Sequence, residues 1–251
     1  MTGPAVLLLP GAGARCDGFF PGLAGSLAAE PGSRVIEYDV PESLPEVTAH
    51  LHDLIARLGT GPVVVVGQSL GGAMALVLAR DHPEDVAGLV LLDVTPVNDA
   101  VLCRRVERAF RAVALMCRIP LIHRMFQRRM VQGAAREARR LQLRPDCAAA
   151  GAQVAAEADL VQLGRVVTGL AELSARFDET GLPRVPAAVI TADRSPDSAS
   201  HRAHQRIADA LGESLLCWPG STHSVHLTHP DEVLAAVRDV LERGQAERTI
   251  T

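Results

Sequence analysis

The run of four valines at 63–66, followed directly by Gly67-Gln68-Ser69-Leu70-Gly71-Gly72, constrains the fold of this chain more than any other feature. Consecutive β-branched residues predict a strand that is buried on both faces of a sheet. The glycines permit a tight turn, and the Ala/Leu-rich residues 73–80 predict a helix immediately after it. Strand, turn and helix together form the G-x-S-x-G pattern, which holds a serine above the edge of a sheet. Ser69 is therefore a candidate nucleophile.

Short apolar segments alternate with helical patterns through much of the chain. Strands are expected at 5–9, 34–38, 63–66, 88–93, 186–191 and 214–218. Helices are expected at 19–29, 44–58, 73–80, 201–211 and 230–242. This alternation predicts an α/β fold, in which a mostly parallel sheet has helices on both of its faces.

The alternation stops between residues 97 and 180, where apolar residues recur at helical spacing and many arginines occur. We interpret this segment as a helical cap, or lid, inserted into a core made of residues 1–96 and 181–251. The arginines are interpreted as the solvated side of amphipathic helices. The apolar lining of the lid is expected to include Leu115, Met116, Phe126 and Met130.

Composition narrows the class of protein. The net charge of −4 gives no basic face for nucleic acid, and no apolar run is long enough to span a membrane. The five cysteines are odd in number and lack C-x-x-C spacing, which is typical of reduced thiols in a cytoplasmic protein. No pair of histidines has the carboxylate and the spacing that a metal site requires. We expect a cytoplasmic protein that needs no cofactor and no metal.

Several residues with catalytic chemistry follow the predicted strands. Ala12 lies in the Gly-rich turn after the first strand, Asp93 and Asp193 end two others, and His223 follows the last. The carboxyl ends of parallel strands meet at one edge of the sheet, so these residues are expected to lie near Ser69. A serine hydroxyl needs a base, a carboxylate that orients the base, and N–H donors for the oxyanion that forms. The chain offers all three.

Three motifs, at residues 9–13, 67–72 and 220–227, resemble the α/β-hydrolase superfamily, specifically its capped branch of esterases and thioesterases. The resemblance extends over essentially the whole chain. It implies that Ser69 is the nucleophile and His223 the base. It also implies that the N–H groups of Leu70 and Ala12 form the oxyanion hole.

The acid of this triad is left open by the sequence. The position where the superfamily usually carries it corresponds to Ser195, which cannot serve as an acid. Asp193 lies two residues earlier and Asp197 two later. Some members carry the acid at the end of the strand that follows the helix after the nucleophile. In this chain that helix is expected at 73–80, and the residue at the end of the next strand is Asp93. Asp93 and Asp193 are the two main candidates.

These observations predict a serine hydrolase that cleaves an ester or thioester of a small molecule through an acyl-Ser69 intermediate. A cyclase or lactonising acyltransferase of secondary metabolism on the same fold is an alternative. A ligand-binding protein with a degenerate triad is another, because position 195 lacks a carboxylate. Epoxide hydrolase and dehalogenase chemistry is disfavoured, since those relatives carry aspartate where this chain has Ser69.

Overall fold

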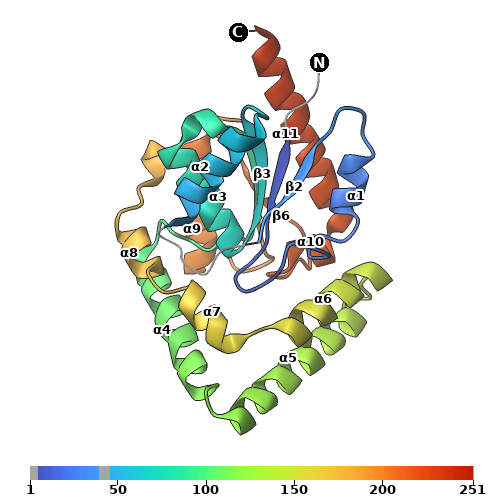
Figure 1. Cartoon of the computed structure of the whole chain (residues 1–251), viewed down its shortest axis with the longest axis vertical. Coiled ribbons are helices and arrows are strands. Elements are labelled where there is room, and N and C mark those ends of the chain that lie inside the picture. Colours follow the sequence, from blue (N-terminus) through green and yellow to red (C-terminus); the bar gives the residue numbers. More distant parts are fainter. Residues whose placement is uncertain (1–4, 40–45, 251) are drawn as a thin grey trace.

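The computed structural model describes residues 5–39 and 46–250, with side chains as far as residue 246. Its centre is a six-stranded sheet in which every neighbouring pair is parallel, in the order β2-β1-β3-β4-β5-β6 (Figure 1). The strands are β1 (Val6–Leu9), β2 (Val35–Glu37), β3 (Val63–Gln68), β4 (Val86–Leu92), β5 (Ala187–Thr191) and β6 (Leu215–Cys217). The predicted parallel α/β architecture is confirmed.

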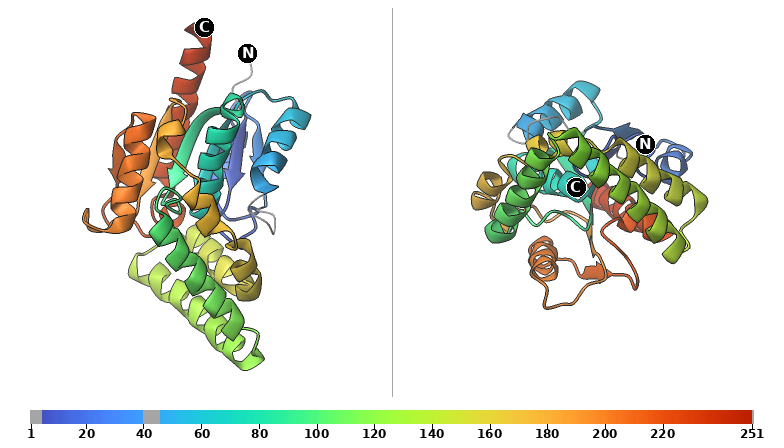
Figure 2. Two further views of the ribbon diagram at one scale, coloured as in Figure 1. Left: turned by 90° about the vertical axis from the view of Figure 1, so that its left-hand side faces the viewer. Right: turned by 90° about the horizontal axis from the view of Figure 1, so that it is seen from below.

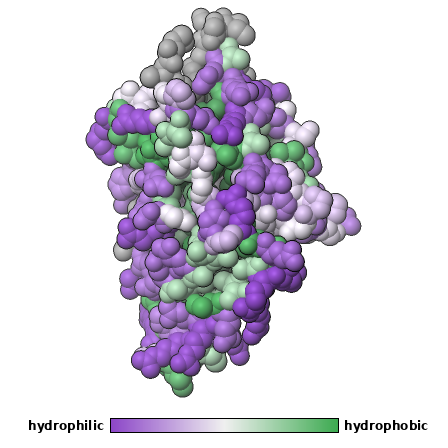
Figure 3. All heavy atoms as spheres, turned by 90° about the vertical axis from the view of Figure 1, so that its right-hand side faces the viewer, coloured by the Kyte–Doolittle hydropathy of each residue, from purple (hydrophilic) through white to green (hydrophobic). Residues whose placement is uncertain are grey.

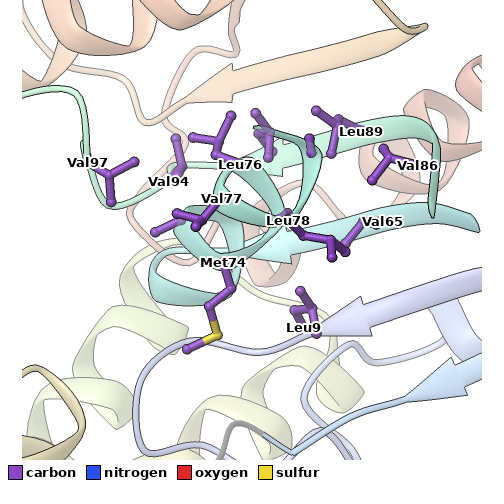
Figure 4. Packing of buried hydrophobic residues seen from close by; sticks show 14 of the residues in the cluster. Leu9, Val65, Met74, Leu76, Val77, Leu78, Val86, Leu89, Val94 and Val97 are labelled. Carbon is purple, nitrogen blue, oxygen red and sulfur yellow. The ribbon is translucent and has the colours of Figure 1, made fainter. Parts of the chain in front are cut away.

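Helices cover both faces of the sheet. One face packs against α2 (Val47–Leu58), α3 (Leu70–Asp81) and α9 (Ala199–Leu211). The other packs against α1 (Leu23–Ala28) and α11 (Pro230–Ile250). Figure 4 shows the first of these cores, where side chains of α3 meet those of β1, β3 and β4.

The valine run explains why β3 occupies the middle of this structure. Val63 and Val65 belong to the core beneath α3, whereas Val64 and Val66 belong to the core beneath α1 and α11. All four side chains have no exposed surface. Burying a valine side chain contributes roughly 1.5–3 kcal/mol, so the strand is stabilised from both faces.

Several boundaries differ from those expected. The helix predicted at 19–29 is limited to α1, because residues 16–22 form turns. The start of the helix predicted at 44–58 lies outside the described residues. The last helix continues beyond residue 242 to Ile250, and a short helix, α10 (Val225–Thr228), follows His223 unexpectedly.

Five helices connect β4 to β5, and they lie across the carboxyl edge of the sheet (Figures 1 and 2). They are α4 (Ala100–Met116), α5 (Pro120–Arg140), α6 (Pro145–Glu157), α7 (Leu160–Val166) and α8 (Leu170–Ala175). The Asp99 carboxylate accepts hydrogen bonds from the first N–H groups of α4, and Asp159 does the same for α7. None of the helices in the described part of the chain is both long and apolar enough to cross a bilayer.

Candidate active site

The turn at Ser69 has the strained geometry of a nucleophile elbow. Ser69 has φ 51° and ψ −114°, a conformation that L residues rarely adopt. Gly67 and Gly72 make it possible, because a Cβ atom on Gly67 would lie only 2.6 Å from the Gly72 backbone. The turn brings Ser69 to the N-terminus of α3, where its hydroxyl borders a cavity.

The loop after β1 packs directly against this turn. A Cβ atom on Gly71 would overlap the carbonyl oxygens of Leu9 and Pro10, so only glycine lets the two backbones approach this closely. Ala12 follows in the same loop and lines the same cavity as Ser69. The N–H of Leu70 belongs to the first turn of α3, where N–H groups lack partners within the helix and the helix dipole favours negative charge.

His223 links Ser69 to Asp93. Its Nε2 atom lies 3.1 Å from Ser69 Oγ, and its Nδ1 atom lies 2.6 Å from Asp93 Oδ2. Because a carboxylate accepts, Nδ1–H donates to Asp93, which leaves the lone pair of Nε2 facing the serine hydroxyl. The three side chains come from the ends of β3, β4 and β6, so the sheet itself brings them together.

Asp93 is almost fully buried and is held by more than its histidine. Its Oδ1 atom accepts hydrogen bonds from the Ala192 N–H, at 2.9 Å, and from Arg194, at 2.6 Å. Burial alone would raise the pKa of this carboxyl. The hydrogen bond and charge of His223, the Ala192 N–H and the Arg194 guanidinium outweigh burial and lower the pKa to about 2. Asp93 is therefore an anion at any physiological pH.

The other acid candidates lie elsewhere. Asp193 is exposed and accepts a hydrogen bond from the Gly220 N–H at 2.8 Å, while its own N–H donates to the Ser221 carbonyl. These two bonds fasten the loop that carries His223. Asp197 is exposed, and its N–H donates to Ser195 Oγ. Of the two main candidates, Asp93 is the one that contacts the His223 ring.

Gln68 is a site residue that the sequence analysis did not single out. Its side chain is buried, and its Nε2–H donates to the carbonyl of His223 at 2.9 Å. Its Oε1 atom lies against Gly11, where a Cβ atom would collide with it. Gln68 thus connects the turn at Ser69 with two loops, the one after β1 that carries Gly11 and the one after β6 that carries His223. A buried amide beside the candidate nucleophile was the available signal.

A cavity of about 260 Å³ lies between the elbow and the overlying helices. Most of its wall is apolar, and α5, α6 and α7 contribute residues such as Ala138, Val154 and Leu163. The expected lid lining was wrong. None of Leu115, Met116, Phe126 and Met130 lines this cavity, and Leu115 is 63 % exposed.

Three ionisable side chains other than His223 line the cavity: His226, Glu137 and the Cys147 thiol, whose pKa burial raises to about 11. His226 is buried and stacks on Phe19, with ring centroids 4.4 Å apart, and burial lowers its pKa to about 3. It is therefore a neutral imidazole at physiological pH, and its buried Nδ1 has no partner among the described residues. Glu137 of α5 is the charged lining residue and gives the wall a negative charge.

One group of possible metal ligands lies far from this site. His52, His82 and Glu84 place one ligand atom each within 4.8 Å of one another, although their spacing in the sequence gave no such indication. Ser69 and His82 flank opposite ends of α3, so this group belongs to the opposite edge of the sheet. The His52 ring is also bonded to Asp85 at 2.7 Å.

Fold and site together define a hydrolase-like α/β enzyme, and comparison with known proteins supports this class. Residues 6–236 match the model of the Alpha/beta hydrolase family, and the chain belongs to that family.

Similar proteins include lipases and an esterase. The chain is 43 % identical to Lipase LipV of Mycobacterium tuberculosis over 72 residues, which are 29 % of this chain and 28 % of the lipase. It is 34 % identical to the sn-1-specific diacylglycerol lipase ABHD11 of Mus musculus over 108 residues, 39 % and 34 % of the two chains. The matches thus span about a third of these relatives. A thermophilic esterase from Thermogutta terrifontis superimposes with a TM-score of 0.73 at 22 % identity, over 97 % of this chain and 91 % of the esterase.

Proposed function

We propose that this protein is a serine hydrolase that cleaves an ester or thioester of a small molecule through an acyl-Ser69 intermediate. The observation that carries the proposal is the continuous chain from Ser69 Oγ through the His223 ring to Asp93, at 3.1 Å and 2.6 Å. Its members belong to three different strand ends, and the chain opens onto a cavity.

In the first half of the reaction, Ser69 Oγ attacks the substrate carbonyl carbon while His223 Nε2 takes the hydroxyl proton. The buried carboxylate of Asp93 stabilises the imidazolium that forms. The carbonyl oxygen becomes an oxyanion, for which the N–H groups of Leu70 and Ala12 are the proposed donors. A donor of this kind is worth roughly 3 kcal/mol in the transition state.

The intermediate then collapses. The bond from the carbonyl carbon to the leaving oxygen or sulfur breaks, and His223 gives its proton to the leaving group. Water attacks the acyl-Ser69 ester, His223 takes a proton from that water, and Ser69 Oγ recovers a proton as the carboxylic acid leaves.

The cavity supports a short or medium aliphatic acyl group as substrate. Its apolar wall excludes water from the acyl chain, and its volume of about 260 Å³ limits the size of that chain. Glu137 disfavours a carboxylate on the substrate, because two negative charges would then share a largely apolar space. The lipase and esterase relatives agree with ester chemistry.

The test combines labelling and turnover. The protein is incubated with a fluorophosphonate probe and, separately, with p-nitrophenyl esters of graded acyl length. We expect covalent labelling at Ser69 and turnover that peaks at a short or medium chain, with Ser69→Ala losing both. A protein that binds esters but neither labels nor turns them over is a ligand-binding protein, and the proposal then fails. Conversion of a hydroxy-ester substrate to a lactone in preference to the free acid indicates a cyclase.

A further inference from the structure

An apolar surface is exposed where α4 meets α5, at the end of the molecule farthest from the sheet (Figures 1 and 3). Seven large hydrophobic side chains are exposed in the described part of the chain, and five of them occur within residues 115–125. We call these five the apolar tip: Leu115 (63 % exposed), Met116 (43 %), Ile119 (54 %), Leu121 (77 %) and Met125 (43 %). Single exposed hydrophobic residues are ordinary, but five gathered at one corner indicate a contact surface.

The helix that carries part of this tip is unusually uncovered. α5 has 21 residues, and none of its side chains is buried. Ala134 and Ala138 of its C-terminal half line the cavity, whereas Leu121 and Met125 of its N-terminal half lie one turn apart on an open face. Another side of this half contacts α6, where Gln127 donates a hydrogen bond to the Ala156 carbonyl. An amphipathic helix normally buries its apolar side, so the exposed face with Leu121 and Met125 is left uncovered among the described residues.

Arginines surround the apolar tip. Residues 101–140 contain eleven arginines and only two acidic residues, although the whole chain has a net charge of −4. All eleven arginines are exposed. Arg118, Arg124 and Arg128 are the closest to the tip in sequence, and none of them forms an ion pair with any residue that the structure describes.

We propose that the apolar tip inserts into an anionic lipid surface, with the surrounding arginines on the headgroup phosphates. Arginine side chains can extend their charged ends to phosphates while apolar neighbours enter the acyl region, and each basic residue near an anionic surface adds about a fivefold gain in binding. The arginines thus complement the charge of such a surface. α5 runs from the tip to the cavity, so the docked protein holds its cavity within about 30 Å of the bilayer.

Other binding partners fit the apolar tip less well. A nucleic acid would pair with the arginines but would leave five apolar side chains in water. A second copy docked tip to tip would bring the two arginine-rich segments together, and like charges repel. An anionic bilayer matches both the charge and the apolarity.

The proposal is tested by co-sedimentation of the full chain with vesicles. Two vesicle types are compared, phosphatidylcholine alone and phosphatidylcholine with one third phosphatidylglycerol, at low and high salt. One variant replaces three tip residues, as I119S/L121S/M125S, and another removes charge, as R124Q/R128Q. Leu216→Ser is the matched control, because Leu216 is an exposed hydrophobic residue on β6. Circular dichroism and turnover of a water-soluble ester confirm that each variant is folded.

We expect binding to the vesicles that contain phosphatidylglycerol, weaker binding at high salt, and a loss of at least about tenfold in the triple variant. The charge variant, which lacks two arginines, should bind about twentyfold less tightly, and Leu216→Ser should bind like the wild type. No binding to anionic vesicles by the wild type overturns the proposal, as does equal binding by the triple variant. Sedimentation velocity and DNA binding address the other binding partners. A dimer abolished by I119S/L121S/M125S, or DNA binding abolished by R124Q/R128Q, without lipid binding, also overturns it.

Discussion

His223 is hydrogen-bonded to Asp93, at the end of β4, rather than to Asp193 beyond β5. The Nδ1–Oδ2 distance is 2.6 Å, and Asp93 is buried whereas Asp193 is exposed. The β4 end adjoins the β3 end that carries Ser69, so an acid there lies behind the histidine without a long loop. Asp193 instead fastens the loop of His223 through the Gly220 N–H.

Asp93→Asn should therefore lower kcat by about 10³–10⁴-fold, because the amide no longer stabilises the imidazolium. Asp193→Asn keeps the orienting carboxylate at Asp93 and should lose less than about tenfold. Steady-state hydrolysis of a p-nitrophenyl ester measures both effects. A large loss in Asp193→Asn with near-normal activity in Asp93→Asn would assign the acid to Asp193.

Arg194 is expected to tune the site through Asp93, which it contacts at 2.6 Å. Its positive charge offsets part of the carboxylate charge that favours the imidazolium of His223. Arg194→Met removes that offset, so protonated His223 becomes more stable and the acidic limb of the kcat/KM profile should move to higher pH. A profile measured between pH 5 and 9 tests this. A shift to lower pH would contradict the assigned effect.

Glu137 is expected to govern the charge of accepted substrates. Glu137→Gln should raise the rate on p-nitrophenyl hemisuccinate relative to neutral p-nitrophenyl butyrate by about fivefold, or ~1 kcal/mol, since it removes a repulsion within the cavity. The ratio of the two kcat/KM values is the measurement, and the neutral ester serves as control. An unchanged ratio would show that substrate does not approach Glu137.

His226 should make the folded protein sensitive to acid. Its pKa falls from 6.5 to about 3 on burial, so the unfolded chain binds the proton more readily than the folded one. Above pH 6.5, His226 is neutral in both states and does not lower the free energy of unfolding. As the pH falls from 6.5 toward 3, protonation of His226 in the unfolded chain lowers the free energy of unfolding by up to about 1.4 kcal/mol per pH unit.

The free energy of unfolding of His226→Phe, measured by denaturant titration, should therefore fall less steeply between pH 6.5 and 4 than that of the wild type. Phenylalanine keeps an aromatic ring against Phe19. Parallel curves for the two proteins would exclude His226 as the source of acid sensitivity.

Local sequence was sufficient for the features that depend on neighbouring residues. The valine run predicted β3, and the Gly-rich turn predicted the elbow at Ser69. Parallel strands made it possible to predict that Ser69, Ala12 and His223 would gather at one edge, because each follows a strand. These inferences require only the order of strands and turns.

Features that depend on long-range packing were beyond the sequence. The choice of acid depends on where the loop after β6 meets the ends of β4 and β5, which local patterns do not encode. The predicted lining of the cavity was wrong for the same reason: Leu115 and Met116 lie in the last turn of α4, where the packing of the cap leaves them exposed. Helical periodicity identifies an apolar face but does not identify its partner.

The central claim, that Ser69 carries the acyl group, is tested most directly by trapping that intermediate. Wild-type protein is mixed with p-nitrophenyl butyrate and quenched in acid within the first turnover. Mass spectrometry then measures the mass of the intact protein and of its proteolytic peptides. We expect a butyryl adduct on the peptide that contains Ser69, and neither adduct nor turnover in Ser69→Ala. Turnover that persists in Ser69→Ala, or an adduct on another residue with Ser69 unmodified, would contradict the claim.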